Sequence, residues 1–294
     1  MKSNRRTTLD IIGMKRRGER IAALTAYDYT SAQMVDAADI PLILIGDTLG
    51  MVVQGEDTTL PVTLDQIIYH AKMVARGATR ALLVGDMPFM TFQTSPEDAL
   101  RNAARLMTEG KVGAVKIEGG VEVTATISRI VRAGIPVCGH LGFTPQSTHA
   151  LGGPRIQAKE PASAIALIDA ALALEDAGAF AIVLELVPAS VAKEISQRLT
   201  IPTLGIGSGP DCDGEIQVFH DLFGLYTDFQ PRHTQRYLNV AHDVCQAARR
   251  FAADVAARRF PGAAQTADLD PQTKETLCAL LRERTSKTAV DVVR

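Results

Sequence analysis

The sequence predicts an α/β protein of the TIM (β/α)8 barrel class with extra C-terminal helices. Short apolar runs recur along the 294 residues, and nearly all end in Gly, Asp or Glu and are followed by a helical pattern. Runs that are almost continuously apolar suit parallel strands buried on both faces. Eight alternating strands and helices favour a closed barrel, and the missing GxGxxG after the first run argues against a Rossmann fold.

Eight apolar runs are the predicted strands of this barrel. They are Ile21–Asp28, Pro41–Asp47, Ala81–Asp86, Ala114–Glu118, Pro136–Gly142, Ala181–Glu185, Pro202–Gly207 and Ile216–His220. Several begin at a proline, which is typical of the boundary between a loop and the next element.

Amphipathic segments between these runs predict the helices. Thr63–Gly77 begins with a capping threonine and ends at a glycine. Ser95–Gly110 has a serine at its N-cap, a proline in its first turn and a glycine at its end, all of which are helix-boundary signals. Pro161–Gly178 and Pro188–Leu199 follow the same scheme.

Two more helices are predicted beyond the barrel, Arg232–Phe260 and Asp270–Arg284. The expected organisation is a catalytic barrel over residues 1–260 and a helical tail over residues 261–294. Apolar residues such as Leu277, Leu280 and Leu281 predict that the tail packs on the barrel or on a neighbouring subunit.

Composition excludes several classes of function. The net charge of −2 and short, separated arginine clusters argue against a nucleic-acid surface. The four cysteines form no CxxC pair and have no histidine at zinc spacing, as expected for free thiols in a reducing compartment. No apolar stretch fits a signal peptide or a membrane span, so we expect a cytoplasmic protein with small-molecule partners.

Ionisable residues stand at the ends of consecutive predicted strands. They are Asp47, Asp86, Lys116, Glu118, His140 and Glu185. In a (β/α)8 barrel the active site is built at this end of the strands. Side chains alternate along a strand, so Lys116 and Glu118 share one face, and the barrel mouth suits them better than the apolar helix side.

Each of these residues also has a purely structural interpretation. Asp47 and Asp86 follow glycines and could cap the next helix. The Lys116–Glu118 pair could be a structural ion pair, and His140 could bind a loop carbonyl. Glu185 is harder to explain this way, because an unpaired charge in a buried strand costs several kcal/mol.

The group as a whole indicates a divalent cation. Carboxylates about 5 Å apart repel by about 3 kcal/mol per pair at an effective dielectric near 20. A bound cation removes that repulsion, and oxygen ligands without Cys favour a hard ion such as Mg²⁺. A 2-oxo acid would chelate such an ion through its keto and carboxylate oxygens.

The chain resembles the ketopantoate hydroxymethyltransferase family through a series of motifs in order. They are Thr25–Asp28, Gly46–Thr48, Gly85–Phe89, Val115–Gly120, Gly139–Ser147, Glu185–Pro188, Gly205–Pro210 and Cys212–Gly214. The match runs from about Thr7 to Phe260, which is nearly the whole predicted barrel.

This resemblance implies transfer of a hydroxymethyl group from 5,10-methylenetetrahydrofolate to 3-methyl-2-oxobutanoate, giving 2-dehydropantoate in pantothenate biosynthesis through a Mg²⁺-stabilised enolate. It implies metal ligands Asp47, Asp86 and Glu118, substrate-binding residues Asp47, Thr48, Asp86, Lys116 and His140, and the general base Glu185. Threonine stands at position 48, where the family usually has serine. A homo-oligomer, specifically a decamer of two pentameric rings, is also implied.

Three other interpretations were weighed. A Mg²⁺-dependent lyase or mutase of the isocitrate lyase and PEP mutase superfamily would chelate a similar acid, but its Lys-Lys-Cys-Gly-like loop is missing. A Schiff-base aldolase would need an unpaired Lys116, which Glu118 argues against. A barrel without catalysis would have lost a ligand or the base, and these residues are all retained.

Overall fold

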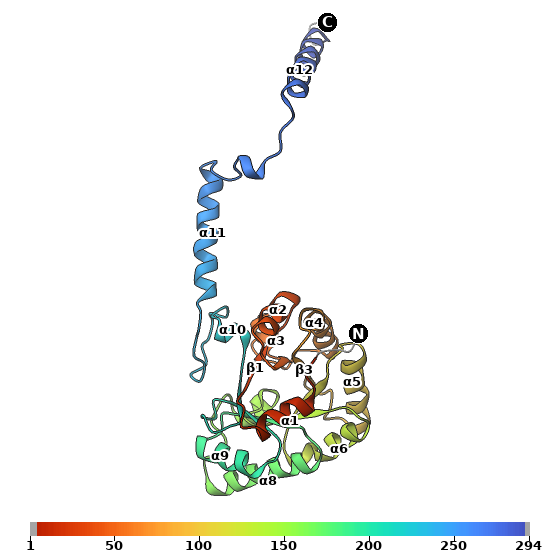
Figure 1. Ribbon diagram of the computed structural model, residues 1–294, viewed down its shortest axis with the longest axis vertical. Helices are drawn as coiled ribbons and strands as arrows, with labels where there is room; N and C mark the ends of the chain where they lie inside the picture. The colour runs from red at the N-terminus through yellow and green to blue at the C-terminus, as the bar shows by residue number, and fades with distance from the viewer. Residues whose placement is uncertain (1–4, 292–294) are drawn as a thin grey trace. The chain divides into compact units, whose positions relative to one another are not determined.

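The computed structural model describes residues 5–291 and contains a closed barrel of eight parallel strands in chain order (Figure 1). The strands are β1 Ile21–Thr25, β2 Leu42–Ile45, β3 Leu82–Asp86, β4 Ala114–Glu118, β5 Val137–Gly142, β6 Ala181–Glu185, β7 Thr203–Ile206 and β8 Gly214–Gln217. β1 pairs in parallel with both β2 and β8, which closes the barrel. The predicted fold class is confirmed.

The first and last predicted strands end elsewhere than expected. β1 stops at Thr25, because the Asp28 side chain accepts a hydrogen bond from Ser31 N at 2.7 Å and caps the following helix. β8 begins at Gly214 and ends at Gln217, so the prediction of Ile216–His220 is wrong in its second half. Phe219 instead starts a short helix, and its N–H donates to the side-chain oxygen Oγ1 of Thr25 on β1 rather than to a backbone carbonyl of that strand.

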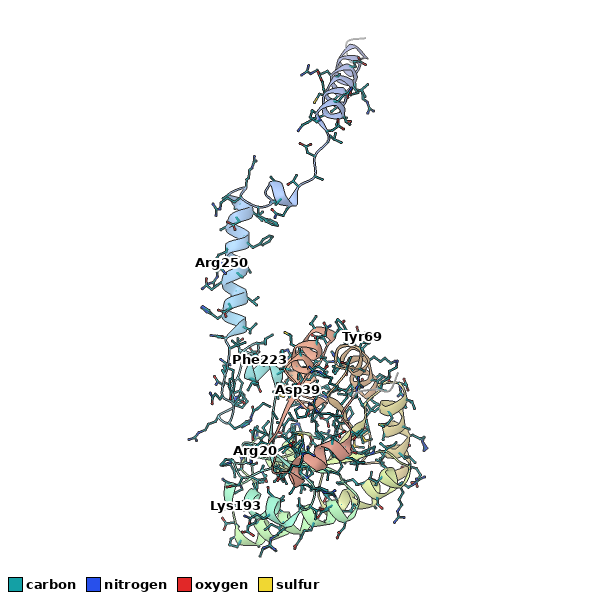
Figure 2. The ribbon with its side chains drawn as sticks, in the orientation of Figure 1. Arg20, Asp39, Tyr69, Lys193, Phe223 and Arg250 are labelled. Carbon is teal, nitrogen blue, oxygen red and sulfur yellow. The ribbon has the colours of Figure 1, made fainter. Side chains whose placement is uncertain are left out.

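Helices surround the barrel in Figure 1. They are α1 Thr8–Arg16, α2 Tyr29–Ala37, α3 Leu49–Val52, α4 Leu64–Gly77, α5 Pro96–Thr108, α6 Thr124–Arg132, α7 Thr148–Leu151, α8 Pro161–Asp176, α9 Ala189–Arg198 and α10 Phe219–Leu222, with 3-10 turns η1 Val121–Val123 and η2 Pro145–Ser147. The labelled Tyr69 and Lys193 project from α4 and α9 (Figure 2). The predicted caps of α4 and α5 are present, since the hydroxyls of Thr63 and Ser95 accept backbone hydrogen bonds.

The predicted alternation of strands and helices is incomplete at one place. Residues 207–213 join β7 to β8 without a helix. Asp213 in this loop accepts hydrogen bonds at Oδ2 from Thr203 N and Thr203 Oγ1, at 2.8 and 3.0 Å. These bonds tie the loop back to the start of β7, so the chain returns to the sheet within a few residues.

Two apolar layers hold the barrel together. One lies between the strands and the outer helices and includes Ile117 and Leu141. The other fills the barrel interior, and Ile11 of α1 closes it at the N-terminal end of the strands. Burying each such side chain contributes about 1.5–3 kcal/mol. The barrel interior is therefore apolar at the N-terminal end of the strands, and its polar side chains lie at the C-terminal end.

The C-terminal part of the chain forms a separate compact unit that begins at Val240. Its helices are α11 Val240–Ala256 and α12 Pro271–Asp291, and α11 has no buried residue. Arg250 extends from α11 in Figure 2. Residues 292–294 of the predicted tail lie outside the described range.

The predicted helix Arg232–Phe260 is wrong over its first eight residues, since α11 starts only at Val240. The Thr234 hydroxyl donates to Gln217 Oε1 on β8 at 2.9 Å, and Tyr237 N donates to Leu222 O at 2.8 Å. These contacts hold the segment against the barrel in a non-helical course. Along the chain, the boundary between the two compact units falls after Asn239, and the domain division at residue 260 stays a prediction. None of the helices in residues 5–291 is long and apolar enough to cross a membrane.

Candidate active site

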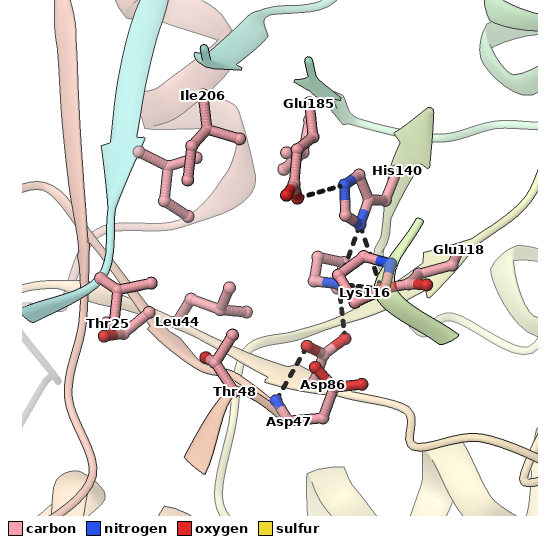
Figure 3. A pocket seen from close by; sticks show the side chains of 14 residues that line it. Thr25, Leu44, Asp47, Thr48, Asp86, Lys116, Glu118, His140, Glu185 and Ile206 are labelled. Carbon is pink, nitrogen blue, oxygen red and sulfur yellow. Dashed lines mark hydrogen bonds and ion pairs between the residues drawn. The ribbon is translucent and has the colours of Figure 1, made fainter. Parts of the chain in front are cut away.

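The residues that the sequence singled out converge on one cavity at the C-terminal end of the strands (Figure 3). Its lining includes Asp47, Thr48, Asp86, Lys116, Glu118, His140 and Glu185. The strand register brings them together, because Asp86 is paired with Lys116 and Glu118 with His140 across neighbouring strands. Neither aspartate caps a helix, since α3 is preceded by Thr48 and α5 is capped by Ser95.

Lys116 lies at the centre of an acidic group. Its Nζ is 2.8 Å from Asp86 Oδ1 and 3.5 Å from Glu118 Oε1. Burial acts to lower the pKa of Lys116, but the charges of Asp86, Glu118 and Asp47 outweigh it and raise the pKa above its usual value. Lys116 is therefore an ammonium ion at neutral pH, which argues against a Schiff-base nucleophile, because that role requires a neutral amine.

Asp47 and Asp86 form a buried acidic pair, each exposed to at most 2%. Burial raises the pKa of Asp47, and the charges of Asp86 and Glu118 raise it further. Burial also raises the pKa of Asp86, against the opposing effect of Lys116. Asp86 Oδ2 accepts a hydrogen bond from Asp47 N at 3.1 Å. One ammonium group thus serves two aspartates and Glu118, so the site retains an excess of negative charge.

His140 bridges two glutamates. Its Nδ1 is 3.3 Å from Glu118 Oε1, and its Nε2 is 3.2 Å from Glu185 Oε2. Burial and the charge of Lys116 act to lower the pKa of His140, but the contacts with Glu118 and Glu185 raise it to about 9. The two carboxylates therefore favour the imidazolium form, although Nδ1 is also 3.3 Å from Lys116 Nζ, and the ring links the acidic group around Lys116 to Glu185.

Gln146 was not identified as a site residue from the sequence, although it lies within the motif Gly139–Ser147. Its Nε2 donates to Asp47 Oδ2 and to Met87 O, both at 2.9 Å. Its backbone N–H donates to Glu118 Oε2 at 3.0 Å. Gln146 is in the turn η2 after β5, and a neutral side chain beyond a strand end carries no signal of its own in the sequence.

The donor set suits a hard divalent cation at Asp47 and Asp86. Asp86 Oδ1 is buried and, despite its ion pair, makes no hydrogen bond of good geometry. Carboxylate oxygens of this kind are the ligands that Mg²⁺ prefers. Among residues 5–291, no three His, Cys, Asp or Glu side chains are already arranged as a metal-binding group. The ligand set with Glu118 therefore stays a prediction.

Comparison with known proteins decides the family. The family model described as ketopantoate hydroxymethyltransferase matches residues 5–263. The chain belongs to the ketopantoate hydroxymethyltransferase family. It is 53% identical over 265 residues to 3-methyl-2-oxobutanoate hydroxymethyltransferase of Chloroflexus aurantiacus, covering 90% of this chain and 94% of that one. The corresponding protein of Dehalococcoides mccartyi is 50% identical, covering 92% of this chain and 98% of that one.

Solved structures share the fold with this family member at much lower identity. Phosphonopyruvate hydrolase in complex with oxalate and Mg²⁺ is similar with a TM-score of 0.58 and 12% identity, covering 96% of this chain and 99% of that one. A 2,3-dimethylmalate lyase of the PEP mutase and isocitrate lyase superfamily is similar with a TM-score of 0.51 and 17% identity, covering 99% of both chains. The lyase alternative thus shares the barrel with this chain, but the sequence places the chain in the ketopantoate hydroxymethyltransferase family.

Proposed function

We propose that this family member transfers a hydroxymethyl group from 5,10-methylenetetrahydrofolate to 3-methyl-2-oxobutanoate, giving 2-dehydropantoate. The relatives that share about half of its sequence over 90% of its length carry the name of this activity. The observation that carries the mechanism is the single cavity that holds two buried aspartates, Lys116 and Glu185.

Glu185 is the proposed general base. Its side chain is 16% exposed, whereas that of its partner His140 is 4% exposed, so Glu185 is the more accessible to a substrate in the cavity. It would take the proton from C3 of 3-methyl-2-oxobutanoate, and the carbanion so formed would attack the one-carbon unit. Water would supply the oxygen of the new hydroxymethyl group, and tetrahydrofolate would leave. The His140 contact orients the carboxylate and balances its charge before the proton arrives.

Asp47 and Asp86 are the proposed Mg²⁺ ligands, with Glu118 as the third predicted member of the set. When bound, Mg²⁺ would withdraw electron density from the 2-oxo acid and so make its C3 proton more acidic. Glu118 also pairs with Lys116 and His140 and accepts from Gln146 N, so it connects the acidic end of the site to the base.

Lys116 and Thr48 are the proposed substrate-binding groups beside these carboxylates. Lys116 keeps its proton, because the surrounding carboxylates raise its pKa. A fixed positive charge at this position would stabilise negative charge that develops on the substrate's keto oxygen. Thr48 lines the same cavity and offers a hydroxyl to the substrate.

Deuterium exchange at C3 of 3-methyl-2-oxobutanoate, followed by NMR, tests this proposal. We expect exchange that depends on Mg²⁺ and disappears in Glu185→Gln. Glu194→Gln is the matched control, since Glu194 is an exposed glutamate of α9 that pairs with Arg198. Exchange that persists without Mg²⁺, or that survives in Glu185→Gln, would contradict the assignment of the metal or of the base.

We also propose that the protein is a homo-oligomer, with a decamer expected from the family resemblance. Sedimentation equilibrium measures the mass directly. A particle of about ten times the 31.5 kDa chain supports the proposal, and a monomer would refute it. The cytoplasmic location stays a prediction.

A further inference from the structure

Recognition of an anionic substrate in this cavity cannot rely on an unpaired lysine or arginine side chain. Among the lining residues, Lys116 is the only lysine or arginine, and Asp86 and Glu118 already hold its ammonium group. His140 is likewise engaged by two glutamates. A carboxylate oxygen of the substrate that the proposed Mg²⁺ would not bind therefore needs a hydrogen-bond donor elsewhere on the wall. Thr25 and Thr48 supply hydroxyls on the part of the wall away from His140 and Glu185 (Figure 3).

The direction of hydrogen bonding on this wall is fixed at one end. The backbone N–H of Phe219 donates to Thr25 Oγ1 at 2.9 Å. An N–H group can only donate, so the Thr25 oxygen accepts and its own hydrogen is left to be donated onward. The neighbouring group is the Tyr27 phenol, which is hydrogen-bonded to Thr48 Oγ1 and lies near enough to the Thr25 hydroxyl for that group to lower the pKa of the phenol.

Tyr27 joins the two threonines. Its Oη is 2.7 Å from Thr48 Oγ1, and the residue is only 1% exposed. The ring is tilted against that of His220 with centroids 5.4 Å apart, and its carbonyl is 2.5 Å from His70 Nδ1. Because both the ring and the backbone are held, the phenol oxygen has a fixed position beside Thr48. Burial raises the pKa of Tyr27, so the group remains a protonated donor.

We propose that Tyr27 is a positioning residue for substrate recognition, which donates its hydroxyl hydrogen to Thr48 and thereby directs the Thr48 hydroxyl hydrogen at the substrate carboxylate. The hydrogen bonds then run in one direction, from Phe219 N–H through Thr25, Tyr27 and Thr48 into the cavity. Each donated hydrogen polarises the next hydroxyl, so the terminal donor is stronger than an isolated threonine. This inference rests on the proposed function, since it takes a 2-oxo acid as the ligand.

Tyr27 should affect the binding of the substrate and not the removal of its proton. Within residues 5–291, no hydrogen bond or ion pair joins Tyr27 to Lys116 or to Glu185. Removing its hydroxyl should therefore weaken the Michaelis complex and leave proton removal intact. The net value of one such hydrogen bond corresponds to about a five- to ten-fold change in an equilibrium constant. If Tyr27 served only to pack the loop, its substitution would instead lower the stability of the protein and kcat together.

The test is a double-mutant cycle of Tyr27→Phe and Thr48→Val, read as KM and kcat for 3-methyl-2-oxobutanoate with saturating Mg²⁺. We expect Tyr27→Phe to raise KM about five- to ten-fold with kcat within two-fold. Thr48→Val should raise KM by at least as much, and the double variant should be no worse than Thr48→Val. Tyr29→Phe is the matched control, because Tyr29 is 44% exposed and its hydroxyl accepts from Gln33 outside the cavity.

Three outcomes would overturn the inference. They are an unchanged KM in Tyr27→Phe, effects of the two substitutions that multiply in the double variant, and a fall in kcat without a rise in KM. If Tyr27→Phe does not fold, Thr25→Val breaks the same series one step earlier, and an unchanged KM there refutes the proposal. A wild-type protein that neither binds nor turns over the 2-oxo acid refutes the proposed function, and this inference with it. If the wild-type protein is active and Tyr27→Phe has the same KM and kcat as Tyr29→Phe, this inference is refuted and the proposed function is not.

Discussion

The protonation of His140 should make the stability of this barrel depend on pH in a defined direction. The pKa of His140 rises from an ordinary 6.5 to about 9 on folding, because Glu118 and Glu185 hold the charged ring. A raised folded pKa contributes stability that is fully present below pH 6.5 and is lost as pH rises through about 9. The shift from 6.5 to about 9 corresponds to about 3 kcal/mol.

Urea unfolding at pH 6 and pH 9.5, in EDTA to exclude divalent ions, measures this contribution. Wild type should lose about 3 kcal/mol more between these pH values than His140→Gln, which has no titrating ring. For each protein, the slope is the change in unfolding free energy between the two pH values. Subtracting the slope of His140→Gln from that of wild type cancels the pH dependence that the two proteins share. It also cancels the pH-independent cost of leaving Glu118 and Glu185 without a partner. His149→Gln is the control, since His149 is exposed, and its slope should equal that of wild type. Equal slopes for wild type and His140→Gln would refute the argument that His140 is charged in the folded protein.

Three further predictions follow from the contacts of the site. Gln146→Leu removes the donors to Asp47 and Met87 and should weaken Mn²⁺ binding about ten-fold by calorimetry, whereas an unchanged affinity would mean that Asp47 is held without it. Lys116→Met leaves buried carboxylates uncompensated and should lower the unfolding free energy by about 3–5 kcal/mol in EDTA. With Mg²⁺ present we expect a smaller loss. Equal losses in EDTA and in Mg²⁺ would argue against a cation among these carboxylates. Gly142→Ala should cost about 3 kcal/mol or more, because φ is +93° and the new Cβ would lie 2.1 Å from Glu185 O. Gly153→Ala has the same φ of +93° with nothing within 4 Å of its Cβ, so a loss as large as that of Gly142→Ala would contradict the role of the clash.

The acidic pair explains why we propose a cation at a site that already holds a lysine. Burial and mutual repulsion raise the pKa of Asp47, and Lys116 cannot compensate every carboxylate around it. The interior beneath these residues is apolar and offers no alternative partners. The proposed Mg²⁺ would therefore supply the missing positive charge at the place where the substrate's oxygens must also bind.

Much of the barrel could be predicted from local patterns. The strand runs from Pro41 to Gly207 overlap the observed strands, because continuous apolar stretches and capped helices are properties of short segments. The errors lie where contacts distant in sequence decide the course of the chain. Ile216–His220 ends early because Phe219 N binds Thr25 on β1, and residues 232–239 are not helical because Thr234 binds Gln217.

The residues of the site likewise fall into those that the sequence could identify and those that it could not. Charged residues at strand ends, such as Asp86 and Glu185, could be identified because the ends of parallel strands meet at one edge of the barrel. The neutral partners of the site could not be identified. Gln146, which binds Asp47, lies in the turn η2, and Tyr27, which binds Thr48, lies in the loop after β1. Neutral side chains in such segments have no distinguishing pattern.

The sequence by itself therefore determined the eight-stranded barrel, the end of the barrel at which the ionisable residues meet, and the family to which the chain belongs. Only the tertiary structure decided how the charges are shared: Lys116 between Asp86 and Glu118, and His140 between Glu118 and Glu185. The physical reason is range. Periodicity and capping act within a few residues of the chain, whereas ion pairs and pKa values depend on distances that exist only once the strands are in register and water is excluded.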